Sequence, residues 1–67
     1  MRVVLQNHKS LLYLKSPKEW TSHIKDALDF QQIIRAVDHI NSFKLQSMDV
    51  LMHFGDPADD LRLRVTN

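Results

Sequence analysis

The chain has 67 residues, a net charge of +1, 43% hydrophobic and 25% charged residues, and no cysteine. This composition is typical of a folded domain rather than a disordered segment, and it excludes disulfide bonds as a source of stability. Because a chain of this length buries only roughly 60% of its unfolded surface, we expect a single small domain over 1–67 that gains from tight packing or from association.

The first part of the chain predicts a β-hairpin over residues 2 to 15. The segment "RVVLQ" is rich in β-branched residues, and "LLYLK" alternates in hydropathy. The polar segment "NHKS" lies between them and contains Asn7, which suits a turn. Proline has no amide hydrogen to donate to a sheet, so we expect the chain to leave the sheet at Pro17.

The following residues predict a break rather than one long helix. At about 100° per residue, the apolar residues of 24–28 point nearly opposite to those that follow residue 29. Asp29 is a good N-cap, and Gln32 stands three residues later, as in a capping box. We therefore expect a helical turn near 22–27 and the main helix from about 30 to 44.

The last third of the chain predicts a second hairpin. The segments "SMDVLMHF" and "LRLRVT" alternate with a period of two, and "GDPADD" between them supplies the turn. The expected fold is α+β, with the element order ββαββ and one main helix packed on one face of an antiparallel sheet. The expected core side of the sheet carries Val3, Leu5, Leu12, Leu14, Met48, Val50, Met52, Phe54, Leu61, Leu63 and Val65.

One helix over four strands covers one face of the sheet and leaves the other face open. The residues expected on that open face mix apolar and polar side chains, which suits contact with a partner. They are Val4, Leu11, Tyr13, Leu51, His53, Arg62 and Arg64. The pattern favours a non-enzymatic domain for protein–protein interaction or self-association, with a homodimer or another protein as the partner.

Trp20, the only tryptophan of the chain, has two interpretations. It follows Pro17 and precedes the predicted helical turn, where a large ring can close the open end of a small core. The alternative is an exposed aromatic residue used for recognition. Both interpretations stay open at the level of sequence.

Motifs for chemistry are missing from the sequence. The four histidines do not form HxH, HxxxH or HExxH, and "DPADD" lacks the spacing of a calcium loop. No serine lies in a GxSxG elbow, and a thiol nucleophile is excluded because the chain has no cysteine. We expect no enzyme activity, no bound metal and no cofactor.

The charges are distributed unevenly along the chain. Residues 1 to 25 carry five basic residues against one acidic residue, a balance of +4, whereas residues 26 to 60 carry seven aspartates against two basic residues, a balance of −5. An alternative function is nucleic-acid binding through Tyr13, Arg62 and Arg64 on the open face of the sheet. No signal peptide or membrane span is recognisable, and the cysteine-free sequence leads us to expect a cytoplasmic location.

The segment "LLYLKSPKEWTSHIKDALDF", with the amphipathic helix that follows it, resembles a pattern found in small uncharacterised bacterial proteins. In that pattern a hairpin precedes W-T, an alanine, and an aromatic residue that leads into the helix. The matching residues are Trp20, Thr21, Ala27, Phe30 and Ala36. The resemblance implies the fold and brings no activity, ligand or catalytic residue with it.

Overall fold

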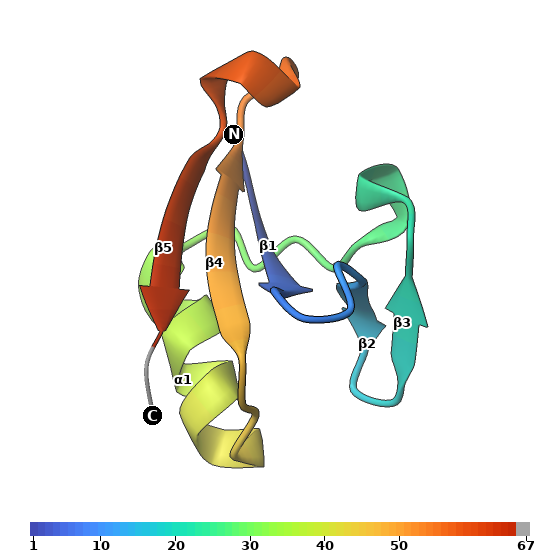
Figure 1. Ribbon diagram of the computed structural model, residues 1–67. Coiled ribbons are helices and arrows are strands. Elements are labelled where there is room, and N and C mark those ends of the chain that lie inside the picture. The colour runs from blue at the N-terminus through green and yellow to red at the C-terminus, as the bar shows by residue number, and fades with distance from the viewer. Residues whose placement is uncertain (66–67) are drawn as a thin grey trace.

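The computed structural model describes residues 1–65, which form an α+β fold with one main helix (Figure 1). In this part of the chain a single antiparallel sheet has the strand order β3-β2-β1-β4-β5. The elements are β1 (Arg2–Asn7), β2 (Tyr13–Ser16), β3 (Glu19–Thr21), the short 3₁₀ helix η1 (Ile24–Asp26), α1 (Ile33–Phe43), β4 (Met48–His53), the 3₁₀ helix η2 (Pro57–Asp59) and β5 (Leu61–Val65). The expected extension of the last strand to Thr66 lies outside the described residues.

Strand β3 is an element that the sequence pattern did not predict. The chain was expected to leave the sheet at Pro17, and this expectation is wrong. Pro17 lies in the turn after β2, where no amide hydrogen is needed, and the chain then returns antiparallel to β2 with Trp20 opposite Leu14. The chain therefore leaves the sheet only after Thr21.

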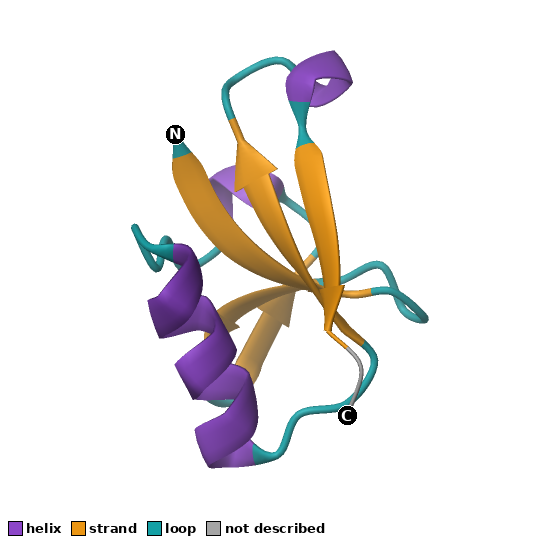
Figure 2. Cartoon of the chain, turned by 90° about the vertical axis from the view of Figure 1, so that its left-hand side faces the viewer, coloured by secondary structure: helices purple, strands orange, loops and turns teal. Residues whose placement is uncertain are grey.

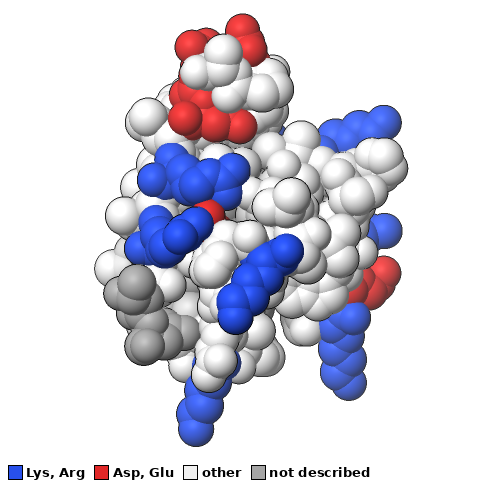
Figure 3. Space-filling model, in the orientation of Figure 1, with Lys and Arg blue, Asp and Glu red and all other residues white. Residues whose placement is uncertain are grey.

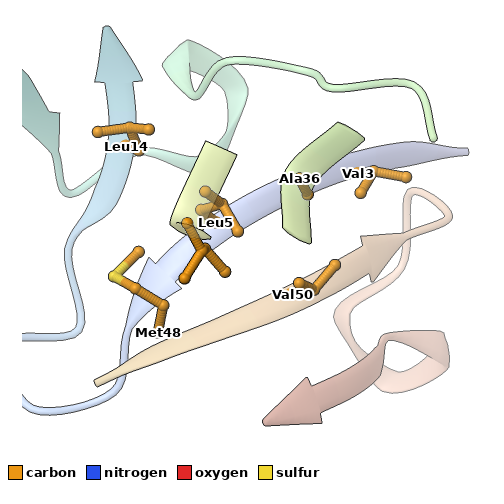
Figure 4. Close-up of a cluster of buried hydrophobic side chains, with 7 residues drawn as sticks. Val3, Leu5, Leu14, Ala36, Met48 and Val50 are labelled. Carbon is orange, nitrogen blue, oxygen red and sulfur yellow. The ribbon is translucent and has the colours of Figure 1, made fainter. Parts of the chain in front are cut away.

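The core lies between α1 and the central strands β1 and β4. Figure 2 shows the helix along one side of the twisted sheet, which we call the inner face. The buried side chains of this core are Val3, Leu5, Leu14, Ala36, Ile40, Met48 and Val50. Figure 4 shows this cluster, whose labelled side chains come from β1, β2, α1 and β4. Burial of this apolar set is the main force that holds the helix on the sheet.

The segment before α1 is attached to β1 through Asp29. Its carboxylate accepts hydrogen bonds from the amides of Val3 (3.0 Å) and Gln31 (2.8 Å), and the amide of Phe30 donates to the carbonyl of Val3 (2.7 Å). The hydrogen bond from Val3 is the main reason why the pKa of Asp29 lies below its ordinary value. The expectation that Asp29 caps the helix is wrong, because α1 begins at Ile33 with Gln32 at the N-cap position.

The other face of the sheet, which we call the outer face, is partly covered. Val4 and Leu51 lie at its centre and are fully buried beneath Ala27, with Ile24 packed against the same cluster. The guanidinium of Arg2 donates to the carbonyl oxygens of Ile24 and Ala27, which holds η1 against the sheet. The expectation of an open outer face is therefore wrong at the centre of the sheet.

Candidate interaction surface on strand β5

Strand β5 lies at one end of the sheet and pairs with β4 through five consecutive residue pairs. Leu61 and Leu63 lie opposite Met52 and Val50, so both leucines are on the inner face. They are nevertheless 57% and 46% exposed, because α1 packs mainly on β1 and β4, and of the β5 residues only Val65 packs against the main core. The expectation that both leucines belong to the core is wrong, and they form an apolar strip beside an unpaired strand edge.

The connection after β4 adds apolar surface to the same part of the molecule. Phe54 follows the last residue of β4 and is 51% exposed, although its alternation with Met52 predicted a core position. Gly55 comes next with a φ of +110°, a conformation that L side chains rarely adopt. Phe54 is therefore left uncovered at the end of β4 that lies away from α1 (Figure 1).

On the outer face, β5 is connected to its neighbours by a polar network around Asp49. The Asp49 side chain is fully buried and accepts hydrogen bonds from Arg62 at 2.9 Å and from Arg64 at 3.2 Å. Arg62 also donates to the side-chain oxygen of Gln6 on β1 at 2.6 Å, so its guanidinium extends over β4 toward the centre of the sheet. This network orders both arginines and satisfies the buried carboxylate.

The two arginines also set the ionisation of Asp49. Burial alone raises the pKa of a carboxyl group, but the hydrogen bonds from Arg62 and Arg64 outweigh that effect, so the pKa of Asp49 lies below its ordinary value. The carboxylate is therefore charged at neutral pH, and it faces two guanidinium groups. The network keeps one excess positive charge, and the Arg62 and Arg64 side chains are 45% and 59% exposed.

An acidic cluster lies directly before β5. Figure 3 shows the acidic side chains gathered at the η2 end of the molecule, next to the basic side chains of β5. In η2 and the residues beside it these are Asp56, Asp59 and Asp60. Asp56 accepts a hydrogen bond from the Ala58 amide at 3.0 Å, and Asp60 contacts Nδ1 of His53 at 2.7 Å. Charges of both signs are therefore adjacent along one strand edge.

The remaining residues of the predicted interaction surface are not brought together. Tyr13 is half-buried and packs against the cluster of Val4 and Leu51, which is covered by η1. Leu11 is 62% exposed, but it lies in the turn between β1 and β2, away from β5. The predicted set is therefore divided into a buried centre, a remote turn, and the Arg62, Arg64 and His53 region near β5.

Trp20 lies at the opposite end of the sheet. It belongs to β3, the other edge strand, and is 39% exposed. It is not part of either buried cluster in the described chain. The position fits neither a fully buried core residue nor a fully exposed recognition residue.

Two residues that organise the β5 region were not predicted as part of the site. Gln6 and Asp49 are the buried polar residues of the described chain, and both contact Arg62. The sequence contained a sign of the role of Asp49. This aspartate stands among apolar residues in one strand of a predicted hairpin, and arginines alternate with apolar residues in the other strand. Gln6 carried no such signal, because its contact depends on the order of the strands.

Within residues 1–65, no group of three or more His, Asp or Glu side chains is arranged to hold a metal ion. None of the helices in the same residues has the length and apolarity needed to cross a lipid bilayer. Comparison of the chain with protein families, curated proteins and solved structures finds no match. The function is therefore inferred from the geometry of the chain itself.

Proposed function

We propose that this chain is a non-enzymatic protein-interaction domain that self-associates through β5. The observation that carries the proposal is the exposure of Leu61 and Leu63 on an edge strand, while the only α-helix in the described chain packs mainly on β1 and β4. Exposed strand edges with apolar side chains are sites where another strand adds to a sheet. A cytoplasmic location is part of the proposal and rests on the cysteine-free sequence.

The size of the domain supports association. A chain of 67 residues has little apolar surface to bury, yet this one leaves several large apolar side chains more than two-fifths exposed. Two of them lie side by side on β5, and Phe54 lies in the connection that leads to it. A partner that covers this strip adds to the stability of the folded domain by mass action.

Nucleic-acid binding through Tyr13, Arg62 and Arg64 has less support. Both arginines share the carboxylate of Asp49, and the acidic cluster of η2 lies next to them (Figure 3). Tyr13 is half-buried against the outer-face cluster, so it offers a restricted surface for stacking. Nucleic-acid affinity that falls steeply with salt would be the signature of this alternative.

The test is light scattering after size-exclusion chromatography over a range of protein concentrations. We expect the wild-type chain, of 7.9 kDa, to elute with twice the monomer mass at high concentration. We expect Leu63→Lys to remain folded by circular dichroism and to associate at least tenfold more weakly, since a charge then lies on the apolar strip.

The matched control is Leu11→Lys, which places the same charge on an exposed leucine in the turn after β1. This variant should associate as the wild-type chain does. A wild-type chain that stays monomeric at every concentration, or a Leu63→Lys variant that still dimerises fully, would contradict the proposal. A raised absorbance at 260 nm in the purified protein would favour nucleic-acid binding instead.

A further inference from the structure

The charges of the segment from Asp60 to Arg64 complement those of a second, identical segment that runs in the opposite direction. Asp60 has extended backbone dihedral angles, and its carboxylate contacts His53 on the outer face, the face that Arg62 and Arg64 share. On the outer face, the segment therefore carries one acidic residue, Asp60, followed by two basic residues, Arg62 and Arg64. Its inner face carries Leu61 and Leu63.

We propose that a second copy of the chain pairs with β5 in antiparallel orientation, with Asp60 of one copy opposite Arg64 of the other. This inference rests on the proposed self-association and names its partner and register. In antiparallel pairing, opposite residues point to the same face. The register places Leu61 opposite Leu63 of the second copy, and it creates two Asp60–Arg64 pairs related by a two-fold axis.

The groups that form these pairs have unused hydrogen-bonding capacity. Within residues 1–65, Arg64 donates from Nε to Asp49, and its two terminal nitrogens donate no hydrogen bond. Asp60 uses Oδ1 for His53, and its Oδ2 accepts no hydrogen bond from the same residues, although the Asp60 side chain is only 18% exposed. An arginine and a carboxylate in this state can pair without giving up their existing contacts.

The axis of the proposed dimer passes beside Arg62, which lies opposite Arg62 of the second copy. Like charges opposite one another destabilise a sheet, but this guanidinium is directed inward by Asp49 and Gln6, away from the open edge. The neighbouring register, with Leu63 opposite itself, places Arg62 opposite Arg64 twice and leaves Asp60 without an arginine. The other neighbouring register, with Leu61 opposite itself, places Asp60 opposite Arg62, whose guanidinium is bound to Asp49 and Gln6 and directed away from the open edge. The charges and the existing hydrogen bonds of Arg62 together therefore favour the register that pairs Asp60 with Arg64.

Pairing in this register joins two five-stranded sheets into one continuous sheet. The open edges of both β5 strands disappear, and four leucines gather on the inner face between the two helices. The second copy therefore covers both the unpaired edge of β5 and the apolar strip that α1 leaves exposed.

Disulfide trapping tests the register directly, because the natural chain has no cysteine. Opposite Cβ atoms in an antiparallel pair lie about 4.5–5.5 Å apart, whereas diagonal ones lie about 7–8 Å apart and are too distant for a disulfide. We would mix Leu61→Cys with isotope-labelled Leu63→Cys under mild oxidation and identify the products by mass spectrometry. We expect the mixed disulfide to exceed either homodimeric disulfide at least tenfold.

The outcomes separate this inference from the proposed function. A Leu61→Cys or a Leu63→Cys homodimer as the main product, in a chain that is dimeric by light scattering, would overturn the register and leave self-association intact. A dimeric chain in which neither variant cross-links would overturn β5 pairing as a whole. A wild-type chain that is monomeric throughout would overturn both proposals.

A charge variant gives a second readout that does not depend on cross-linking. Asp60→Asn keeps an oxygen for His53 and removes the charge that pairs with Arg64, so we expect the dimer to dissociate on the order of tenfold more readily. Asp59→Asn removes an exposed charge one residue earlier, in η2, and should change dissociation less than twofold. Equal effects of the two substitutions would show that only net charge matters and would contradict the proposed pair.

Discussion

The two edges of the sheet differ in how they meet solvent. Strand β3 has three residues, and its pairing with β2 shifts in register between Leu14 and Ser16. Strand β5 has five residues in unbroken register with β4 and carries two exposed leucines. Short length and irregular pairing are devices that prevent an edge from adding another strand. Only β3 has them, so β5 is the edge whose construction favours pairing.

The basic residues at the two edges also have different roles. Lys15 and Lys18 are exposed near β3, where solvated lysines discourage strand addition. Arg62 and Arg64 at β5 instead bind a buried carboxylate, which directs Arg62 toward the centre of the sheet. Basic residues at β5 therefore fasten the strand to the domain rather than keeping other strands away from it.

Removal of both arginines should have the largest effect on stability. In Arg62→Ala/Arg64→Ala, Asp49 becomes a buried carboxylate without a counter-charge, which costs about 3–5 kcal/mol of unfolding free energy. We expect the lower part of that range, because water can enter the space that the half-exposed arginines vacate. Urea unfolding followed by circular dichroism measures the change.

The matched control at the other edge is Lys15→Ala/Lys18→Ala, which removes the same number of positive charges. Its unfolding free energy should change by less than about 1 kcal/mol, since neither side chain is buried. Adding Asp49→Asn to the double arginine variant should restore part of the loss, because no buried charge remains. Equal losses in the two double variants would mean that the Asp49 network does not stabilise β5.

Leu14 and Trp20 lie opposite each other in β2 and β3 but differ in burial. Leu14 is 1% exposed and belongs to the main core, so Leu14→Ala should cost about 2–5 kcal/mol. Trp20 is 39% exposed, and Trp20→Ala should cost only about 1–2 kcal/mol. Thermal unfolding of the two variants is the measurement, and a larger loss for Trp20→Ala would restore its interpretation as a core plug.

Much of the fold was predictable from local patterns. Both hairpins and the break before the helix followed from alternation, turn residues and the change of helical phase, and all three are present. Strand β3 was not predictable in this way. Three residues are too few to show a period, and Pro17 was expected to end the sheet rather than to form a turn inside it.

Errors about the surface had a different origin. The alternation of apolar and polar residues correctly predicts that Leu61 and Leu63 lie on the inner face. It carries no information about the width of the helix or about where the helix crosses the sheet. For the same reason, Val4 and Leu51 were expected to be open, although η1 covers them. Which face a residue occupies is a local property, whereas what covers that face depends on contacts between distant segments.

Two aspartates that hold segments of the fold in place, one at β5 and one before α1, should respond to acid in the same way. Asp49 holds β5, and Asp29 holds the segment before α1 against β1. Both carboxyl groups have a pKa below the ordinary aspartate value of 3.8 in the folded chain. A group of this kind stabilises the fold fully above its unfolded pKa, and the contribution is lost as the pH falls through the folded pKa.

We therefore expect the unfolding free energy to decrease as the pH falls below about 4, and urea titrations at several pH values measure that decrease. Asp49→Asn should be less stable than the wild-type chain at neutral pH and should show a shallower decrease in acid. Asp29→Asn should behave in the same way, because the Val3 amide then donates to a neutral amide oxygen instead of a charged carboxylate. Asp38→Asn, on the exposed side of α1, should keep the wild-type slope. An unchanged slope in Asp49→Asn would mean that the two arginines do not hold this carboxylate in its charged form, and β5 would then be fastened mainly by its backbone pairing with β4.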